Sequence, residues 1–215
     1  MTHAELVQEQ AKTLTSPRRE YTVLSWLLFA GMNLFYGRRK TLSKFKVLEI
    51  IARVPYQSWE HVAYIAMTHT YSQPGFARRI FEFIRESRAQ QDNEQWHLLI
   101  LEEMVQNQGR RESFFMARIL PQIIAFLYYH ISWLLYVADP AWSYGLNADF
   151  EDHAEHEYME FVKENMDLEG TPFRSDFEKD YGSFGSLADL FRQIALDERH
   201  HKEESLAHLP AARFS

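Results

Sequence analysis

Two short segments of this chain, residues 94–97 (EQWH) and 198–201 (ERHH), pair Glu94 with His97 and Glu198 with His201. Residues three positions apart lie on one face of a helix, so each pair can offer an oxygen and a nitrogen to the same metal ion. The spacing alone is weak evidence, because a chain with 21 glutamates and 10 histidines also produces such pairs on solvated helix faces. The pairs therefore predict a metal site only if further ligands join them.

Two lone glutamates are candidates for those ligands. Glu49 stands inside the apolar run 47–51 (VLEII), and Glu151 comes near the start of a later helical stretch. A bare carboxylate on an apolar face is costly unless it is paired or bound to a metal. The order along the chain is Glu, Glu-x-x-His, Glu, Glu-x-x-His, which is the ligand set of carboxylate-bridged di-iron helical bundles. The chain has no cysteine, and hard oxygen and nitrogen ligands suit two irons better than a zinc or calcium site.

The elements that must carry these ligands read as helices, because glycine and proline are few, at 8 and 7, and the apolar spacing is helical. We expect an all-α, ferritin-like four-helix di-iron bundle with additional interfacial helices. Its domain would span residues 21–208, after a polar lead-in (1–20) and before a tail (209–215). The predicted helices are 21–36, 46–69 with a kink at Pro55, 77–108 after a turn at 73–75, 112–138, 144–165 and, after a loop at 166–185, 186–208.

The charge is distributed unevenly along the chain. The formal net charge is −7, which argues against a nucleic-acid binder, yet residues 1–50 carry +4 and the remainder −11. The uncharged stretch 21–36 is shorter than the roughly 20 residues needed to span a bilayer, and the basic residues 38–40 follow it. This pattern favours a helix that lies in the lipid interface. Residues 119–138 are long enough to span, but Pro121, Gln122 and His130 favour a half-buried, half lipid-facing helix.

The N-terminus does not resemble a secretory signal, because Glu5 and Glu9 occupy the place of a basic region. An arginine-rich transit peptide is not visible either. We therefore expect a bacterial chain or a processed one. Its predicted place is a monotopic position on a bacterial inner or thylakoid membrane, at the cytoplasmic or stromal side.

Four motifs, in order, resemble those of the alternative oxidase family of quinol oxidases. Residues 48–56 (LEIIARVPY) resemble the family's LETIARVPY, and residues 93–98 (NEQWHL) its NERMHL. Residues 151–158 (EDHAEHEY) and 197–201 (DERHH) are similar to its ESHA…Y and RADEAHH motifs. The resemblance runs from about residue 34 to 208 and is closest to the plastid terminal oxidase branch.

Carried over position by position, the resemblance implies a set of site residues. Asn93 and Asp197 would orient ligands, and Tyr158 would be the redox-active tyrosine, although without the motif it reads as a core aromatic. The quinol would be contacted by Lys44, Leu48 and Glu157. Two of these depart from the family: Lys44 replaces a usual arginine and Glu157 a usual threonine. Ile50 likewise replaces the threonine of the family's motif. The implied iron ligands are Glu49, Glu94, His97, Glu151, Glu198 and His201.

The implied activity is oxidation of ubiquinol or plastoquinol coupled to reduction of O2 to water by two irons, without proton pumping, in a homodimer. Two alternatives stay open: a di-iron hydroxylase or desaturase of a lipid or quinone, and a metal-free helical membrane-binding module. We expect the acidic run 149–169, apart from Glu151, to be mostly a solvated helix face. His153, His156 and His200 are expected at the surface or beside the ligands.

Overall fold

The computed structural model describes residues 1–109, 111–210 and 213–214, and within them every regular element is a helix. The predicted all-α fold is therefore confirmed. The elements in chain order are α1 (His3–Thr15), α2 (Val23–Tyr36), α3 (Leu42–Ala52), α4 (Val54–Thr70), α5 (Pro74–Asn107), the π-helical turn η1 (Phe115–Ile119), α6 (Leu120–Ala138), α7 (Pro140–Glu164), the 3-10 turn η2 (Met166–Gly170) and α8 (Leu187–His208).

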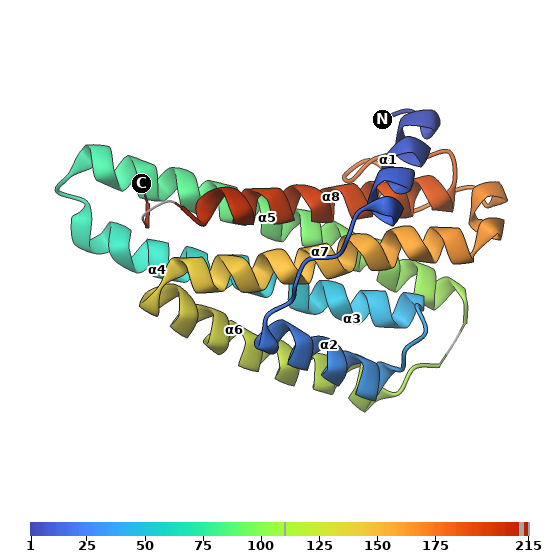
Figure 1. Cartoon of the computed structure of the whole chain (residues 1–215), viewed down its shortest axis with the longest axis horizontal. Coiled ribbons are helices and arrows are strands. Elements are labelled where there is room, and N and C mark those ends of the chain that lie inside the picture. Colours follow the sequence, from blue (N-terminus) through green and yellow to red (C-terminus); the bar gives the residue numbers. More distant parts are fainter. Residues whose placement is uncertain (110, 211–212, 215) are drawn as a thin grey trace.

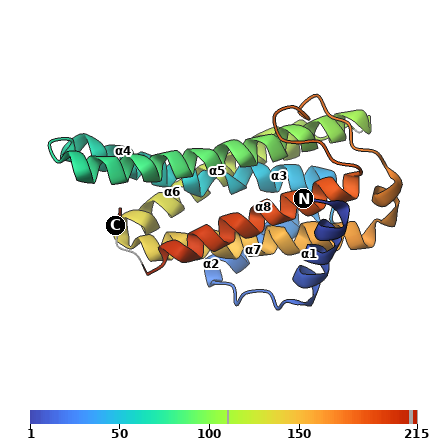
Figure 2. The same ribbon diagram turned by 90° about the horizontal axis from the view of Figure 1, so that it is seen from above.

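The bundle is built from two layers of paired helices (Figures 1 and 2). In one layer α3 and α4 follow each other along the length of α5, and in the other α7 packs against α8. Helix α6 lies against α3, α4 and α7, and α2 lies near it on the same side of the molecule. The four segments predicted to carry ligands, α3, α5, α7 and α8, thus surround one interior.

Local signals explain most helix boundaries. The Ser186 hydroxyl accepts the N–H of Asp189 and caps α8, and Gly109 follows α5 with a φ of +62°. Helix α3 ends at Ala52, just before Pro55, so the predicted kink is a full break. The predicted turn at 73–75 is wrong. Because proline is tolerated in the first turn of a helix, α5 begins at Pro74, and the chain reverses just before it.

The polar lead-in contains a helix that we did not predict. Thr2 and Glu5 form a capping box at the start of α1, and Leu6 is buried. The Gln10 side chain donates to the carbonyl of Met159, and Glu9 pairs with Arg199 at 2.5 Å. Helix α1 is therefore packed against α7 and α8, which its own polar composition does not reveal.

The acidic run on α7 is not the solvated face that we expected. Asp149, Asp152 and Glu155 are buried because cationic partners from distant segments cover them. Those partners, with their N···O distances, are Arg19 to Asp149 (3.2 Å), Lys202 to Asp152 (3.1 Å) and to Glu155 (2.5 Å), and Arg199 to Glu155 (2.9 Å). Asp149 also accepts from the backbone N–H of Thr22, the residue that caps α2, at 2.8 Å. The run therefore anchors the N-terminal segment to the bundle.

Candidate metal centre

All six residues proposed as ligands converge at one buried place between α3, α5, α7 and α8. Their donor atoms form two groups, each within 4.8 Å: Glu49, Glu94, His97 and Glu198, and Glu94, Glu151, Glu198 and His201. Glu94 and Glu198 belong to both groups. Four donors at each of two positions, with two carboxylates shared, is the arrangement that a pair of bridged metal ions needs.

The donor atoms in this centre have no other use in the fold. Eight of them are buried without a hydrogen-bond partner: Glu49 Oε2, both oxygens of Glu94, His97 Nδ1, Glu151 Oε2, both oxygens of Glu198 and His201 Nδ1. They lie against one another, with His97 Nδ1 3.3 Å from both Glu49 Oε2 and Glu198 Oε1. Buried polar atoms are normally paired, so a cluster of orphans fits a place for cations.

The electrostatics of the centre point the same way. Burial raises the pKa of Glu49 and of Glu198 to about 8, and burial together with the charge of Glu198 raises the pKa of Glu151. Burial would also raise the pKa of Glu94, but the neighbouring His201 and His97 outweigh this effect and lower it. Without metal, Glu49, Glu151 and Glu198 are thus biased toward their protonated forms, and two divalent cations would balance the charge of the four carboxylates and displace those protons. The residues present therefore fit a di-metal group.

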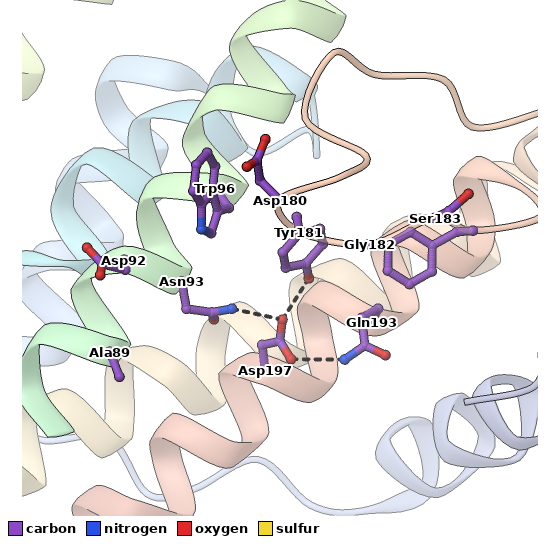
Figure 3. A pocket seen from close by; sticks show the side chains of 11 residues that line it. Ala89, Asp92, Asn93, Trp96, Asp180, Tyr181, Gly182, Ser183, Gln193 and Asp197 are labelled. Carbon is purple, nitrogen blue, oxygen red and sulfur yellow. Dashed lines mark hydrogen bonds between the residues drawn. The ribbon is translucent and has the colours of Figure 1, made fainter. Parts of the chain in front are cut away.

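Asp197 and Asn93 lie where the sequence places them, beside a ligand. Asp197 Oδ2 is 3.2 Å from His97 Nε2 and accepts from Asn93 Nδ2 at 3.3 Å (Figure 3). Nε2 donates to Asp197 in this contact, so Nδ1 is the nitrogen that faces the carboxylates and that a metal ion would bind. The Tyr181 hydroxyl donates to the same oxygen at 2.6 Å, and Gln193 donates to the other. Tyr181 comes from the loop before α8, where no sequence signal marked it.

Tyr158 lies against the centre and is fully buried. Its hydroxyl donates to Glu49 Oε1, and its ring stacks on Phe45 with 4.2 Å between centroids. Burial and the charge of Glu49 raise the pKa of Tyr158 well above its usual value. The hydroxyl therefore keeps its proton, with a carboxylate oxygen beside it as the acceptor.

Tyr56 has the corresponding place on the other side of the centre, and we did not single it out. Its hydroxyl donates to Glu151 Oε1 at 2.6 Å and accepts from Asn147 at 2.9 Å. Tyr56 is the last residue of the motif at 48–56, so the sequence did contain a signal for it. We did not use that signal because a tyrosine at this position can equally be an ordinary buried aromatic of the core. Each lone glutamate of the centre thus accepts from one buried tyrosine.

The three residues expected to contact quinol are not among the lining residues of the cavity between α2 and α7. A cavity of about 660 Å³ opens between α2 and α7, lined by Arg18, Tyr21, Trp26, Phe29, Ala30, Asn33, Leu34, Arg38 and His153. Lys44 donates to Asn33 at 2.7 Å and Glu157 accepts from Arg18 at 3.2 Å, so both lie behind its walls. Leu48 is buried in the core. His153, expected at the surface or near a ligand, is a lining residue that accepts or donates at Nδ1 with Arg18 at 3.1 Å.

The same side of the molecule exposes many large apolar side chains. On α2 they include Val23 and Leu27, and on α6 they include Phe126 and Leu134, each more than half exposed. The segment Phe115–Ala138 is long and apolar enough to cross a membrane by length and composition. Only a third of it is buried, and its inward residues Tyr128, Ser132 and Tyr136 recur every four positions. This periodicity describes an amphipathic helix with one apolar face outward.

A helical bundle that closes two Glu-x-x-His pairs and two lone glutamates around one buried centre belongs to the class of carboxylate-bridged di-metal proteins. A family model, that of the alternative oxidases, matches residues 19–208. The chain therefore belongs to the alternative oxidase family, as its motifs predicted.

A curated relative shows which branch this chain resembles. Over 126 residues it is 36% identical to "Ubiquinol oxidase 4, chloroplastic/chromoplastic" of Arabidopsis thaliana, an alignment that covers 59% of this chain and 33% of the relative. The chain thus matches about a third of the length of that plastid protein. The predicted likeness to the plastid branch is confirmed.

Proposed function

We propose that this protein is a quinol:oxygen oxidoreductase with two iron ions held by Glu49, Glu94, His97, Glu151, Glu198 and His201. The observation that carries the proposal is the pair of four-donor groups that share Glu94 and Glu198, with eight buried donor atoms that have no hydrogen-bond partner. When bound, the irons would supply the redox chemistry that reduces O2 to water. Family membership and the named relative, an ubiquinol oxidase, support the same activity.

The number of electrons needed to reduce O2 determines how many quinols each reaction uses. Two quinols release four electrons and four protons, which convert one O2 to two waters, so no further reductant is needed. We propose that Tyr158 relays one of these electrons: it would give up an electron, release its proton to Glu49 Oε1, and regain both from the quinol, so that the four electrons still come from two quinols. Asp197 holds the imidazole of His97 so that Nδ1 stays turned toward the carboxylates. The apolar residues that enclose the centre exclude water from it.

The cavity between α2 and α7 is our proposed quinol site. Its polar residues Arg18, Asn33 and His153 suit a hydroxylated ring, and its apolar residues Trp26 and Leu34 suit a lipid tail. Lys44 and Glu157 act on the substrate through Asn33 and Arg18, which they hold in place. Burial lowers the pKa of Lys44, so a substrate here meets no strongly solvated ammonium.

We propose a monotopic position on the membrane, with the apolar faces of α2 and α6 in the lipid and the exposed Arg38 and Arg39 at the headgroups, whereas Lys40 pairs with Glu160 and Glu164 of α7. A quinol that diffuses in the lipid would then enter the cavity directly. A protein bound to one face of the bilayer has no path across it, so oxidation would not pump protons. The homodimer remains a prediction from the family resemblance, which light scattering in detergent tests.

Oxygen uptake with quinol as sole reductant tests the activity. The purified protein should consume O2 and form two quinones for each O2, with no other protein added. Glu94→Ala should abolish uptake, whereas Glu82→Ala, which alters an exposed residue of the same helix, should not. A requirement for a separate reductase, or a hydroxylated product, would instead establish the hydroxylase or desaturase alternative.

A further inference from the structure

A second cavity lies in the groove between α5 and α8, away from the apolar faces of α2 and α6. It has a volume of about 240 Å³. Its lining residues are Glu86, Ala89, Gln90, Asn93, Asp197, His200, His201 and Glu204. Ala89, Asn93 and Asp197 also line the neighbouring cavity of about 640 Å³, in which Figure 3 shows Asn93 and Asp197 hydrogen-bonded to each other. The groove therefore joins solvent to the residues beside the metal centre.

His201 connects this groove to the centre itself. It lines the cavity, and its Nδ1, which has no hydrogen-bond partner, lies 2.7 Å from Glu94 Oε1 in the interior. His201 is 3% exposed, whereas Glu94, Glu151, Glu198 and His97 are 0% exposed. Of the six proposed ligands it is thus the most accessible, and it contacts both the groove and the centre.

The groove has the donors and the charge that a hydrated dication needs. Glu86, Asp197 and Glu204 supply carboxylates, and no lysine or arginine is among the lining residues. In the structure these carboxylates contact histidine or neutral groups instead: Glu86 contacts His208, Asp197 accepts from Asn93 and Tyr181, and Glu204 accepts from Gln90. His200 Nε2 lies 3.0 Å from Glu204 Oε1, so a nitrogen and an oxygen stand together near the mouth. Clustered carboxylates attract cations to a cleft, and these donor types bind ferrous ion.

The quinol cavity is unsuited to the same task. Its charged lining residues are Arg18 and Arg38, and its mouth carries Trp26 and Leu34. A hydrated divalent cation would meet like charge and apolar surface there. Since the six ligands are buried on all sides, metal must reach them through a specific part of the structure.

We propose that the groove between α5 and α8 is the route by which ferrous ions enter and leave the metal centre. Glu204 and His200 receive the ion at the mouth, and His201 passes it to the shared carboxylates by rotation of its ring. The inference rests on the di-iron centre proposed above. It assigns a function to His200 and Glu204, which are not among the six proposed ligands.

The rate of metal uptake tests the route directly. The full chain is freed of metal with a chelator, and its folding is checked by circular dichroism. Anaerobic Fe²⁺ is then added, and uptake is followed in samples quenched with a coloured chelator. Glu204→Gln should slow uptake about three- to tenfold, because it removes one attracting charge. Ala89→Arg, which places a cation and bulk in the groove, should slow it further. Both should still reach the metal content of the unaltered chain.

Glu203→Gln is the matched control, since it makes the same change at the neighbouring exposed residue and should load at the original rate. Equal rates for Glu204→Gln, Ala89→Arg and the unaltered chain would overturn the route while leaving the centre in place. Slower loading once the apolar face is covered by lipid nanodiscs would also overturn it. If the unaltered chain binds no iron at all, the proposed centre fails and the route fails with it.

Discussion

The cavity between α2 and α7 and the cavity between α5 and α8 differ in almost every physical property. The one between α2 and α7 is lined by arginines and aromatic residues and opens among exposed apolar side chains. The one between α5 and α8 is lined by carboxylates and histidines, without a lysine or arginine. The bundle thus presents opposite charge and polarity on two sides of one site. We infer that a lipid-soluble reductant and a water-soluble metal reach it separately.

The difference follows from which helices carry the ligands. Helices α5 and α8 each place a Glu-x-x-His pair inward and polar residues one turn away on the side that faces the groove. Helix α7 instead turns Asp149 toward Arg19 of the N-terminal segment, which leads directly into α2, and turns Asp152 and Glu155 toward cations of α8. The carboxylates of α7, near the apolar side of the molecule, are therefore neutralised by cations, whereas the carboxylates that line the groove between α5 and α8 keep their negative charge.

The largest expected effect is on metal content, and it distinguishes a glutamate shared by the two four-donor groups from one that belongs to a single group. Glu198 belongs to both four-donor groups, whereas Glu49 belongs to one. Glu198→Gln should lose nearly all metal and all oxygen uptake, and Glu49→Gln should retain about one ion per chain while losing uptake. Metal analysis of the purified variants measures this. Equal metal loss in both would contradict the shared arrangement of Glu94 and Glu198.

The apolar side is tested by charge. The double variant Leu27→Glu, Phe126→Glu alters one exposed residue on each of α2 and α6. It should weaken binding to lipid vesicles at least about a hundredfold, since each apolar side chain contributes about 1.5–3 kcal/mol on burial. Metal content and uptake with a water-soluble quinol should be unchanged. Met166→Glu, at an exposed residue of η2, should bind vesicles normally. Undiminished binding by the double variant would show that this face does not contact lipid.

Sequence reasoning succeeded where the cause is local and failed where it is tertiary. The Glu-x-x-His pairs in 94–97 and 198–201, which the structure brings together, depend on spacing within one helix, and the sequence displays that spacing directly. Burial of Asp149 and Asp152 depends on Arg19 and Lys202, which no periodicity connects to them. Helix α1 escaped prediction for the same reason, because its polar side chains are satisfied by α7 and α8.

A smaller effect is expected from Tyr56, which the motif contains but does not explain. Tyr56→Phe removes the hydrogen bond to Glu151 and leaves Asn147 with one acceptor fewer. Loss of a buried partner should lower the free energy of unfolding by about 1–3 kcal/mol. Chemical denaturation of the metal-loaded protein measures it. Tyr64→Phe, at an exposed residue of α4, should cost nothing detectable, and an equal cost for both variants would contradict a specific role for Tyr56.

The smallest effect concerns the end of α8, beyond the groove. His208 Nε2 lies 2.7 Å from Glu86 Oε1, and the hydrogen bond with Glu86 raises the pKa of His208 despite partial burial. A histidine whose folded pKa is raised binds its proton more tightly when folded, so the stabilisation is complete below the unfolded pKa, near 6.5. It is lost as pH rises through the higher folded pKa. The contribution should be below about 1 kcal/mol, because the pair is partly solvated.

Urea denaturation of the metal-loaded protein at pH 6 and pH 9 measures this contribution as the difference between the original chain and His208→Gln. The two proteins should differ more at pH 6 than at pH 9, where the original imidazole is neutral. Glu86→Gln should reduce the pH-dependent difference and also slow metal uptake, because the same carboxylate lines the groove. His208→Gln should leave uptake unchanged or make it faster, since it frees that carboxylate for a cation. Slower uptake in His208→Gln would show that the histidine, rather than Glu86, attracts the ion.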